Sequence, residues 1–126
     1  MKRIVIDLDK TITLGDTNDY AAVSPNKPVI DRLREYQQDG FEIVIATSRN
    51  MRTHQNSFGK IIAETVPGII DWLRMHEIPF DEIWVGKPWC GTEGFYVDDR
   101  AIRPDEFASL DYSEIQALIG DTADDA

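Results

Sequence analysis

The first residues able to do chemistry are two aspartates, Asp7 and Asp9, directly after the apolar run of residues 4–6. Asp7 is suited to be a nucleophile, because a carboxylate is ionised at pH 7 and can form an acyl phosphate that water later hydrolyses. If the chain stays extended, the side chain of Asp9 points the same way as that of Asp7. A nearby like charge raises a carboxyl pKa, which predicts that Asp9 gives and takes protons.

Three further apolar runs each end in polar side chains of a different kind. These are a hydroxyl, an ammonium group and a second pair of carboxylates: Thr47, Lys87, Asp98 and Asp99. In an open parallel sheet such strand ends converge on one crevice, where ligands bind. Together with the first aspartate pair, they predict a site for a divalent metal and a phosphoryl group.

This ordered set of four segments, from Asp7 to Asp99, resembles the haloacid dehalogenase superfamily of aspartate-nucleophile phosphohydrolases. Residues 47–52, 86–91 and 98–104 look like the capsule-biosynthesis phosphatases within it. The resemblance implies a Mg²⁺-dependent phosphomonoesterase acting on a small phosphorylated sugar or polyol, in capsule or surface-polysaccharide precursor synthesis. It also implies a three-layer α/β/α Rossmann-like fold with a parallel sheet and no separate cap domain.

The resemblance assigns a catalytic role to each matching residue. Asp7 is the nucleophile, and Asp9 handles protons with its side chain while its backbone carbonyl binds the metal. Thr47 binds a phosphoryl oxygen, a role that Ser48 could also fill. Lys87 pairs with the nucleophile and the phosphate.

The metal is expected to be Mg²⁺, which prefers oxygen ligands and needs only one or two carboxylates besides phosphate. Its protein ligands by resemblance are Asp7, Asp9, Asp98 and Asp99. Asp98 directly ends an apolar run, which favours it as the direct ligand. Asp99 would then act through water or orient Lys87.

Four residues that follow the second apolar run are candidates for substrate binding: Ser48, Arg49, Asn50 and Arg52. Arginine is well shaped to hold phosphate or sugar hydroxyls, although solvation at a helix start would explain the arginines equally well. Lys10 departs from the family, whose members usually carry glycine at that position. It places an extra cation beside the nucleophile loop.

Hydrophobic periodicity predicts alternating strands and helices, as in an α/β fold. Buried strands are expected over residues 3–8, 41–47, 82–86 and 94–98. A helix is expected to start at Ser24-Pro25 or Asn26 and to stop at Gly40. Two helices, or one helix with a break at Pro67 and Gly68, are expected over 60–76, and a short helix over 112–119. The polar segment 12–24 is predicted to be a mobile loop or small hairpin that gates the site. With no room for a cap domain, the site is open, or is covered by this loop or a neighbouring subunit in a homo-oligomer.

Length and composition limit the possible domain organisation, partners and localisation. The 126 residues allow one domain, over 1–120, followed by an acidic, disordered tail at 121–126. The net charge of −10 argues against a nucleic-acid partner, because such binding depends on clustered Lys and Arg. One cysteine excludes an internal disulfide, and the hydropathy pattern predicts neither an export signal nor a membrane-spanning stretch. We expect a cytoplasmic protein, with no membrane partner, that acts on a small phosphorylated metabolite.

Two alternatives stay open. A polynucleotide or nucleotide phosphatase uses the same chemistry, but the acidic composition disfavours a polynucleotide substrate. A phosphate-binding or receiver-like signalling module also combines an acid pair, a hydroxyl and a lysine. In receivers the phosphorylated aspartate follows a later strand, whereas no aspartate ends the predicted strand at 41–47.

Overall fold

The computed structural model describes residues 1–15 and 19–120 and divides the chain into two compact units, Met1–Trp89 and Cys90–Ala126. The acidic tail predicted at 121–126 lies outside the described residues. A single domain over 1–120 therefore stays a prediction. Within the described ranges, no helix has the length and apolar character that crossing a membrane requires.

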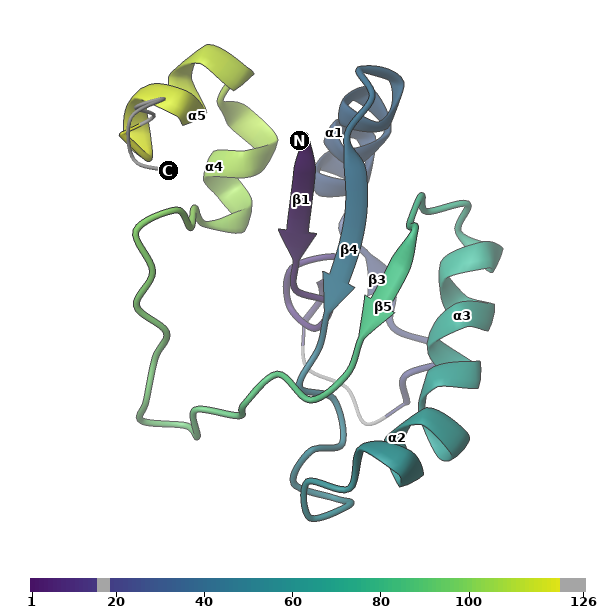
Figure 1. The fold of residues 1–126 in the computed structure, drawn as a ribbon. Helices are drawn as coiled ribbons and strands as arrows, with labels where there is room; N and C mark the ends of the chain where they lie inside the picture. The colour runs from purple at the N-terminus through teal and green to yellow at the C-terminus, as the bar shows by residue number, and fades with distance from the viewer. Residues whose placement is uncertain (16–18, 121–126) are drawn as a thin grey trace. The chain divides into compact units, whose positions relative to one another are not determined.

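The first unit is built on a parallel sheet of three strands in the order β1-β4-β5 (Figure 1). These strands are β1 (Arg3–Ile6), β4 (Glu42–Ala46) and β5 (Glu82–Trp84). Ile4 pairs with Ile43, and Ile45 pairs with Ile83. The strands predicted within 3–8, 41–47 and 82–86 are confirmed, and the chain has a mixed α/β fold.

The central strand β4 explains why the sheet forms here. Its residues Ile43, Val44 and Ile45 are fully buried, as expected for a parallel strand covered on both faces. Their β-branched side chains fit a pleated surface well. The carboxyl end of β4 is thereby held next to those of its neighbours, where the polar residues follow.

A small hairpin follows β1, as one of the two predictions for residues 12–24 stated. Strand β2 (Thr13–Leu14) pairs antiparallel with β3 (Ser24–Pro25). The indole N–H of Trp72 donates a hydrogen bond to the carbonyl of Val23 over 3.1 Å, and both side chains are buried. The returning strand of the hairpin is thus anchored to the helical part of the first unit.

Helix α1 (Lys27–Gln38) carries its predicted apolar face inward. Val29, Ile30, Leu33 and Tyr36 are all buried. Proline in the first turn needs no N–H partner and is pre-organised for a helix. The chain leaves the helix through Gly40 at φ +89°, a backbone conformation that glycine adopts without strain.

The segment 60–76 is divided into two helices, as predicted. Helix α2 (Phe58–Glu64) is followed by Thr65, which caps it, and α3 (Val66–Met75) begins directly after Thr65. Pro67 lies in the first turn of α3, where proline is tolerated but cannot continue a preceding helix. The break therefore falls just before Pro67.

In the second unit, residues 90–120 hold two helices, α4 (Pro104–Ser109) and α5 (Tyr112–Leu118). Helix α5 confirms the prediction for 112–119. It begins with a capping box in which Asp111 and Glu114 exchange side-chain to backbone hydrogen bonds. Helix α4 was not predicted, although proline at its start and acids in its first turn are typical of a helix N-terminus.

The fourth strand predicted at 94–98 is absent: the structure shows irregular chain there. Phe95 and Val97 are 79% and 87% exposed. A strand forms only where another strand accepts its backbone hydrogen bonds, and no strand is paired with this segment in the described part of the chain. The sequence has the pattern of a buried strand without the pairing that would bury it.

Candidate active site

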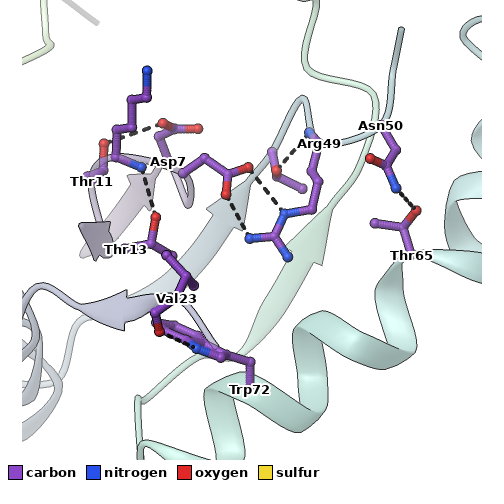
Figure 2. Close-up of polar contacts among 11 residues, drawn as sticks. Asp7, Thr11, Thr13, Val23, Arg49, Asn50, Thr65 and Trp72 are labelled. Carbon is purple, nitrogen blue, oxygen red and sulfur yellow. Dashed lines mark hydrogen bonds and ion pairs between the residues drawn. The ribbon is translucent and has the colours of Figure 1, made fainter. Parts of the chain in front are cut away.

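The loop after β1 holds Asp7 at the carboxyl end of the sheet. The backbone N–H groups of Thr11, Ile12 and Thr13 all point to the carbonyl of Leu8, at 2.9–3.3 Å. Leu8 itself is fully buried and fixes the loop to the core. The hydroxyl of Thr11 donates to Asp7 Oδ2 over 3.3 Å and so helps to hold the Asp7 side chain in place (Figure 2).

Lys10 occupies the turn in the left-handed region, at φ 61°. Its N–H donates to Thr13 Oγ1 over 3.0 Å, and Thr13 is buried. A left-handed conformation is strained for residues with a Cβ and free of that strain for glycine. This explains why the resemblance leads one to expect glycine there: the turn conformation, rather than a contact, selects it.

Replacing Lys10 with glycine should stabilise the protein by about 0.5–1 kcal/mol, because the strain of the left-handed residue is removed. Urea unfolding of Lys10→Gly against the wild type measures this. Lys60→Gly, inside α2, is the matched control and should cost about 1 kcal/mol. A loss of stability for Lys10→Gly would show that contacts of the lysine side chain outweigh the strain.

Asp7 lies between a hydroxyl and an ammonium group. Lys87 Nζ is 3.5 Å from Asp7 Oδ1, and both side chains are about one-third exposed. Burial raises the pKa of Asp7 above its usual value, and it outweighs the Lys87 ammonium and the hydrogen bonds, which lower the pKa. The charge of Asp9 makes the smallest contribution. Lys87 thus supplies a positive charge that favours the ionised nucleophile.

Asp9 is held by a two-point ion pair with Arg49. The guanidinium Nη2 is 2.7 Å from Oδ1, and Nε is 3.2 Å from Oδ2. Arg49 is only 7% exposed, and its guanidinium also lies 4.0 Å from the centre of the Tyr20 ring. The explanation of Arg49 as a solvated residue is therefore wrong. A protonated Asp9 carboxyl would give up part of this pairing, so proton transfer at Asp9 is coupled to Arg49.

Thr47 joins the ends of β4 and β5. It is buried, its N–H donates to the carbonyl of Trp84 over 2.9 Å, and its carbonyl accepts from the N–H of Lys87 over 3.2 Å. Its Oγ1 accepts from the N–H of Arg49 at 3.0 Å. The structure thus links Thr47 to both Lys87 and Arg49 through the backbone.

The remaining candidates for substrate binding differ in their surroundings. Asn50 is in the left-handed region at φ 61°, and its Nδ2 donates to Thr65 Oγ1 over 2.7 Å (Figure 2). It therefore fastens the loop after β4 to the start of α3. Ser48 is half-buried, and Arg52 is exposed. Of the two predicted arginines, Arg52 is the one that presents its side chain to solvent.

Asp98 and Asp99 belong to the second unit, where both are exposed. Asp98 Oδ1 accepts from the N–H of Arg100 over 2.9 Å, which closes a small turn directly after the strand-like segment. Within the described ranges, the structure shows no cluster of three or more His, Cys, Asp or Glu side chains suited to a metal. The metal role of this second acid pair stays a prediction.

Two site residues were missed by sequence reasoning. Thr13 anchors the nucleophile loop through Lys10, and Tyr20 covers the guanidinium of Arg49. Threonine at a strand start gave no distinct signal. Tyr20 was noticeable as a rare large side chain in the polar segment 12–24, and a lone aromatic beside a charged site is a reasonable partner for arginine.

The raised pKa of Asp7 predicts how stability depends on pH. The folded state holds the proton on Asp7 more tightly than the unfolded chain, so the contribution of Asp7 to stability falls as pH rises above about 3.8. Asp7→Asn removes this dependence. We expect the difference in melting temperature, Asp7→Asn minus wild type, to increase from pH 4 to pH 7 in thermal scans. A gain that shrinks with rising pH would show that the lost contact with Lys87 dominates.

No protein-family model matches the chain, and no curated protein matches it. Among solved structures, the crystal structure of an MCSG target protein from Vibrio cholerae is 56% identical, with a TM-score of 0.93 over 95% of this chain and 98% of the Vibrio chain. A chain of the Pnkp1/Rnl/Hen1 complex is 19% identical, with a TM-score of 0.50 over 87% of this chain and 35% of that larger chain. The second likeness concerns the fold alone.

Proposed function

The chain belongs to the same protein family as the Vibrio cholerae protein, and we propose that it is a Mg²⁺-dependent phosphomonoesterase of the haloacid dehalogenase type. The observation that carries the proposal is the surroundings of Asp7. A carboxylate at the end of a parallel strand contacts both an ammonium group, Lys87, and a hydroxyl, Thr11. A second carboxylate, Asp9, follows two residues later.

In the first step of the proposed reaction, a carboxylate oxygen of Asp7 attacks phosphorus. Asp9 first takes up a proton from water and gives up part of its ion pair with Arg49. The bond between phosphorus and the substrate's ester oxygen then breaks, and Asp9 gives this proton to the departing alkoxide. Lys87 offsets the negative charge that the phosphate and Asp7 bring together. Phosphoryl transfer depends mainly on such positioning and charge neutralisation.

In the second step, water attacks the phosphorus of the aspartyl phosphate, and the acyl phosphate bond breaks. Asp9 takes the proton of the attacking water, which releases inorganic phosphate and returns Asp7 to its carboxylate form. Arg49 holds Asp9 at two points in the resting protein. We assign to Arg49 the task of keeping Asp9 oriented through both proton transfers.

The described residues fit Mg²⁺ in their chemistry. The carboxylate of Asp7 is a hard oxygen ligand, and Arg49 occupies both side-chain oxygens of Asp9. This agrees with a metal that meets the backbone carbonyl of Asp9 instead of its side chain. Asp98 and Asp99 would complete the ligand set. Bound Mg²⁺ would supply positive charge against the phosphate.

The substrate we propose is a small phosphorylated sugar or polyol, used in making capsule or other surface-polysaccharide precursors in the cytoplasm. Support comes from the resemblance of residues 47–52, 86–91 and 98–104 to capsule-biosynthesis phosphatases. Ser48 and Arg52 are the proposed contacts to the substrate beyond its phosphate. The acidic composition of the chain speaks against a polynucleotide.

A phosphatase screen tests this function. Sugar, polyol and nucleotide monophosphates would be incubated with the protein and Mg²⁺, and released phosphate would be measured. We expect turnover of a sugar or polyol phosphate that stops in excess chelator and returns when Mg²⁺ is restored, because uncompensated carboxylates repel phosphate. Undiminished activity in chelator would contradict the metal assignment. Preference for a nucleotide would contradict the substrate class.

A further inference from the structure

Two features of the described residues bear on how the chain pairs: the open edge of strand β1 and the exposed apolar side chains in the strand-like segment 94–98. β1 pairs only with β4 in the described part of the chain, which leaves its other edge open, and Val5 on it is 56% exposed. Phe95 and Val97 are exposed on the strand-like segment. An exposed segment with a strand pattern can pair with an open strand edge, and such pairing satisfies the backbone groups of both.

The second unit is too small to be stable alone. Its described part, residues 90–120, buries only Phe107 and Ile115. Chains below about 40 residues usually need disulfides, metals or a partner to fold, and Cys90, the only cysteine, has no second cysteine to bridge to. The second unit therefore requires a surface on which to pack.

The segment that connects the two units is short for a chain that would have to return to the start of β1 in the same copy. Lys87 is held at the carboxyl end of β1 by Asp7, so a strand parallel to β1 that begins at Gly94 must start at the opposite end of the sheet. Only residues 88–93 are available for the return. Parallel strands usually need a connection of about a dozen residues or more.

The chain between Cys90 and Gly94 reduces this reach further. A Cβ at Gly94 would collide with the carbonyl of Cys90, so the backbone turns back on itself there. Residues 94–98 of a second copy are not limited by the length of this connection. The chain that leads to them does not start at Lys87 of the copy whose β1 strand they would join.

We propose that residues 94–98 of one copy add a fourth parallel strand to the β1 edge of a second copy, reciprocally, in a symmetric exchanged dimer. Aligning the carboxyl ends of the strands places Tyr96 beside Val5, and Asp98 beside Asp7 of the other copy. Each active site then combines Asp7, Asp9 and Lys87 of one chain with Asp98 and Asp99 of the other. The role of the second acid pair rests on the proposed function, whereas the strand pairing does not.

Cross-linking tests the pairing without reference to activity. Two variants in a Cys90→Ser background, Val5→Cys and Tyr96→Cys, would be mixed, unfolded, refolded together and oxidised. The exchanged dimer predicts a disulfide-linked heterodimer on non-reducing gels. Ile62→Cys, equally exposed at 56% but on α2, replaces Val5→Cys as the control and should give no link with Tyr96→Cys.

A disulfide within one chain in the double variant Val5→Cys/Tyr96→Cys, without linked heterodimer from the single variants, would overturn the exchange. A monomeric mass for the wild-type protein in light scattering would also overturn it.

Complementation tests the shared site. Asp7→Asn and Asp98→Asn are each expected to be inactive, but co-refolded together they should recover about one quarter of wild-type activity, since half of the dimers are mixed and each has one intact site. Asp7→Asn with Lys87→Ala should recover nothing, because these residues contact each other within one chain. An active wild type without recovery would overturn the sharing. An inactive wild type with cross-linked dimers would reject the proposed function and retain the strand exchange.

Discussion

Asp7→Asn is expected to lower kcat for every phosphate ester by at least about 1,000-fold, because an amide cannot serve as the nucleophile and the two steps of the reaction both pass through this side chain. Steady-state release of phosphate under saturating Mg²⁺ measures the effect. Asp71→Asn is the matched control, since Asp71 is exposed on α3, and it should keep the wild-type rate.

The loss must be one of chemistry and not of folding. Asp7→Asn should unfold cooperatively and melt at neutral pH no lower than the wild type, because burial disfavours the charge that it removes. A near-normal rate in a folded Asp7→Asn protein would move the nucleophile to another residue, with Asp9 the first to be examined.

Arg49→Ala is expected to lower kcat by about 100-fold, the usual size of a lost general acid–base contribution. Arg49 contacts Asp9 and not the surface, so a sugar phosphate and a generic aryl phosphate should lose activity equally. The pH–rate profile should also change shape, because proton transfer at Asp9 is coupled to this pair. A profile of unchanged shape would indicate a purely structural role.

Arg52→Ala is the matched control for Arg49→Ala, because Arg52 is an arginine of the same loop that is exposed. It should raise KM for the preferred substrate and leave the aryl phosphate almost unaffected. If Arg49→Ala instead affects only the preferred substrate, then Arg49 selects the substrate, as the sequence alone predicted.

The elements that local patterns determine could be predicted from the sequence. The buried run of β4, the apolar face of α1 and the break before Pro67 each follow from residues close to one another in the chain. The nearness of Lys87 to Asp7 also followed, because parallel strand ends converge.

The features that could not be predicted depend on distant partners. Arg49 reaches Asp9 across 40 residues, and nothing in the local pattern distinguishes an arginine held by a carboxylate from one that binds substrate. The strand predicted at 94–98 was wrong, because pairing depends on a second strand that the local sequence does not specify. From the sequence, Lys10 could be recognised only as a departure from the glycine that the resemblance leads one to expect. The left-handed backbone conformation at this position explains that expectation.

The most direct test of the central claim is detection of the phosphorylated enzyme. The protein would be mixed with Mg²⁺ and a ³²P-labelled phosphate ester that it hydrolyses. The reaction would be quenched in acid within milliseconds, and the protein digested for peptide mapping. We predict label on the peptide that contains Asp7, lost on treatment with hydroxylamine as an acyl phosphate should be, and absent from Asp7→Asn. Label on any other residue, or rapid turnover with no labelled protein at any quench time, would contradict an aspartate-nucleophile phosphatase.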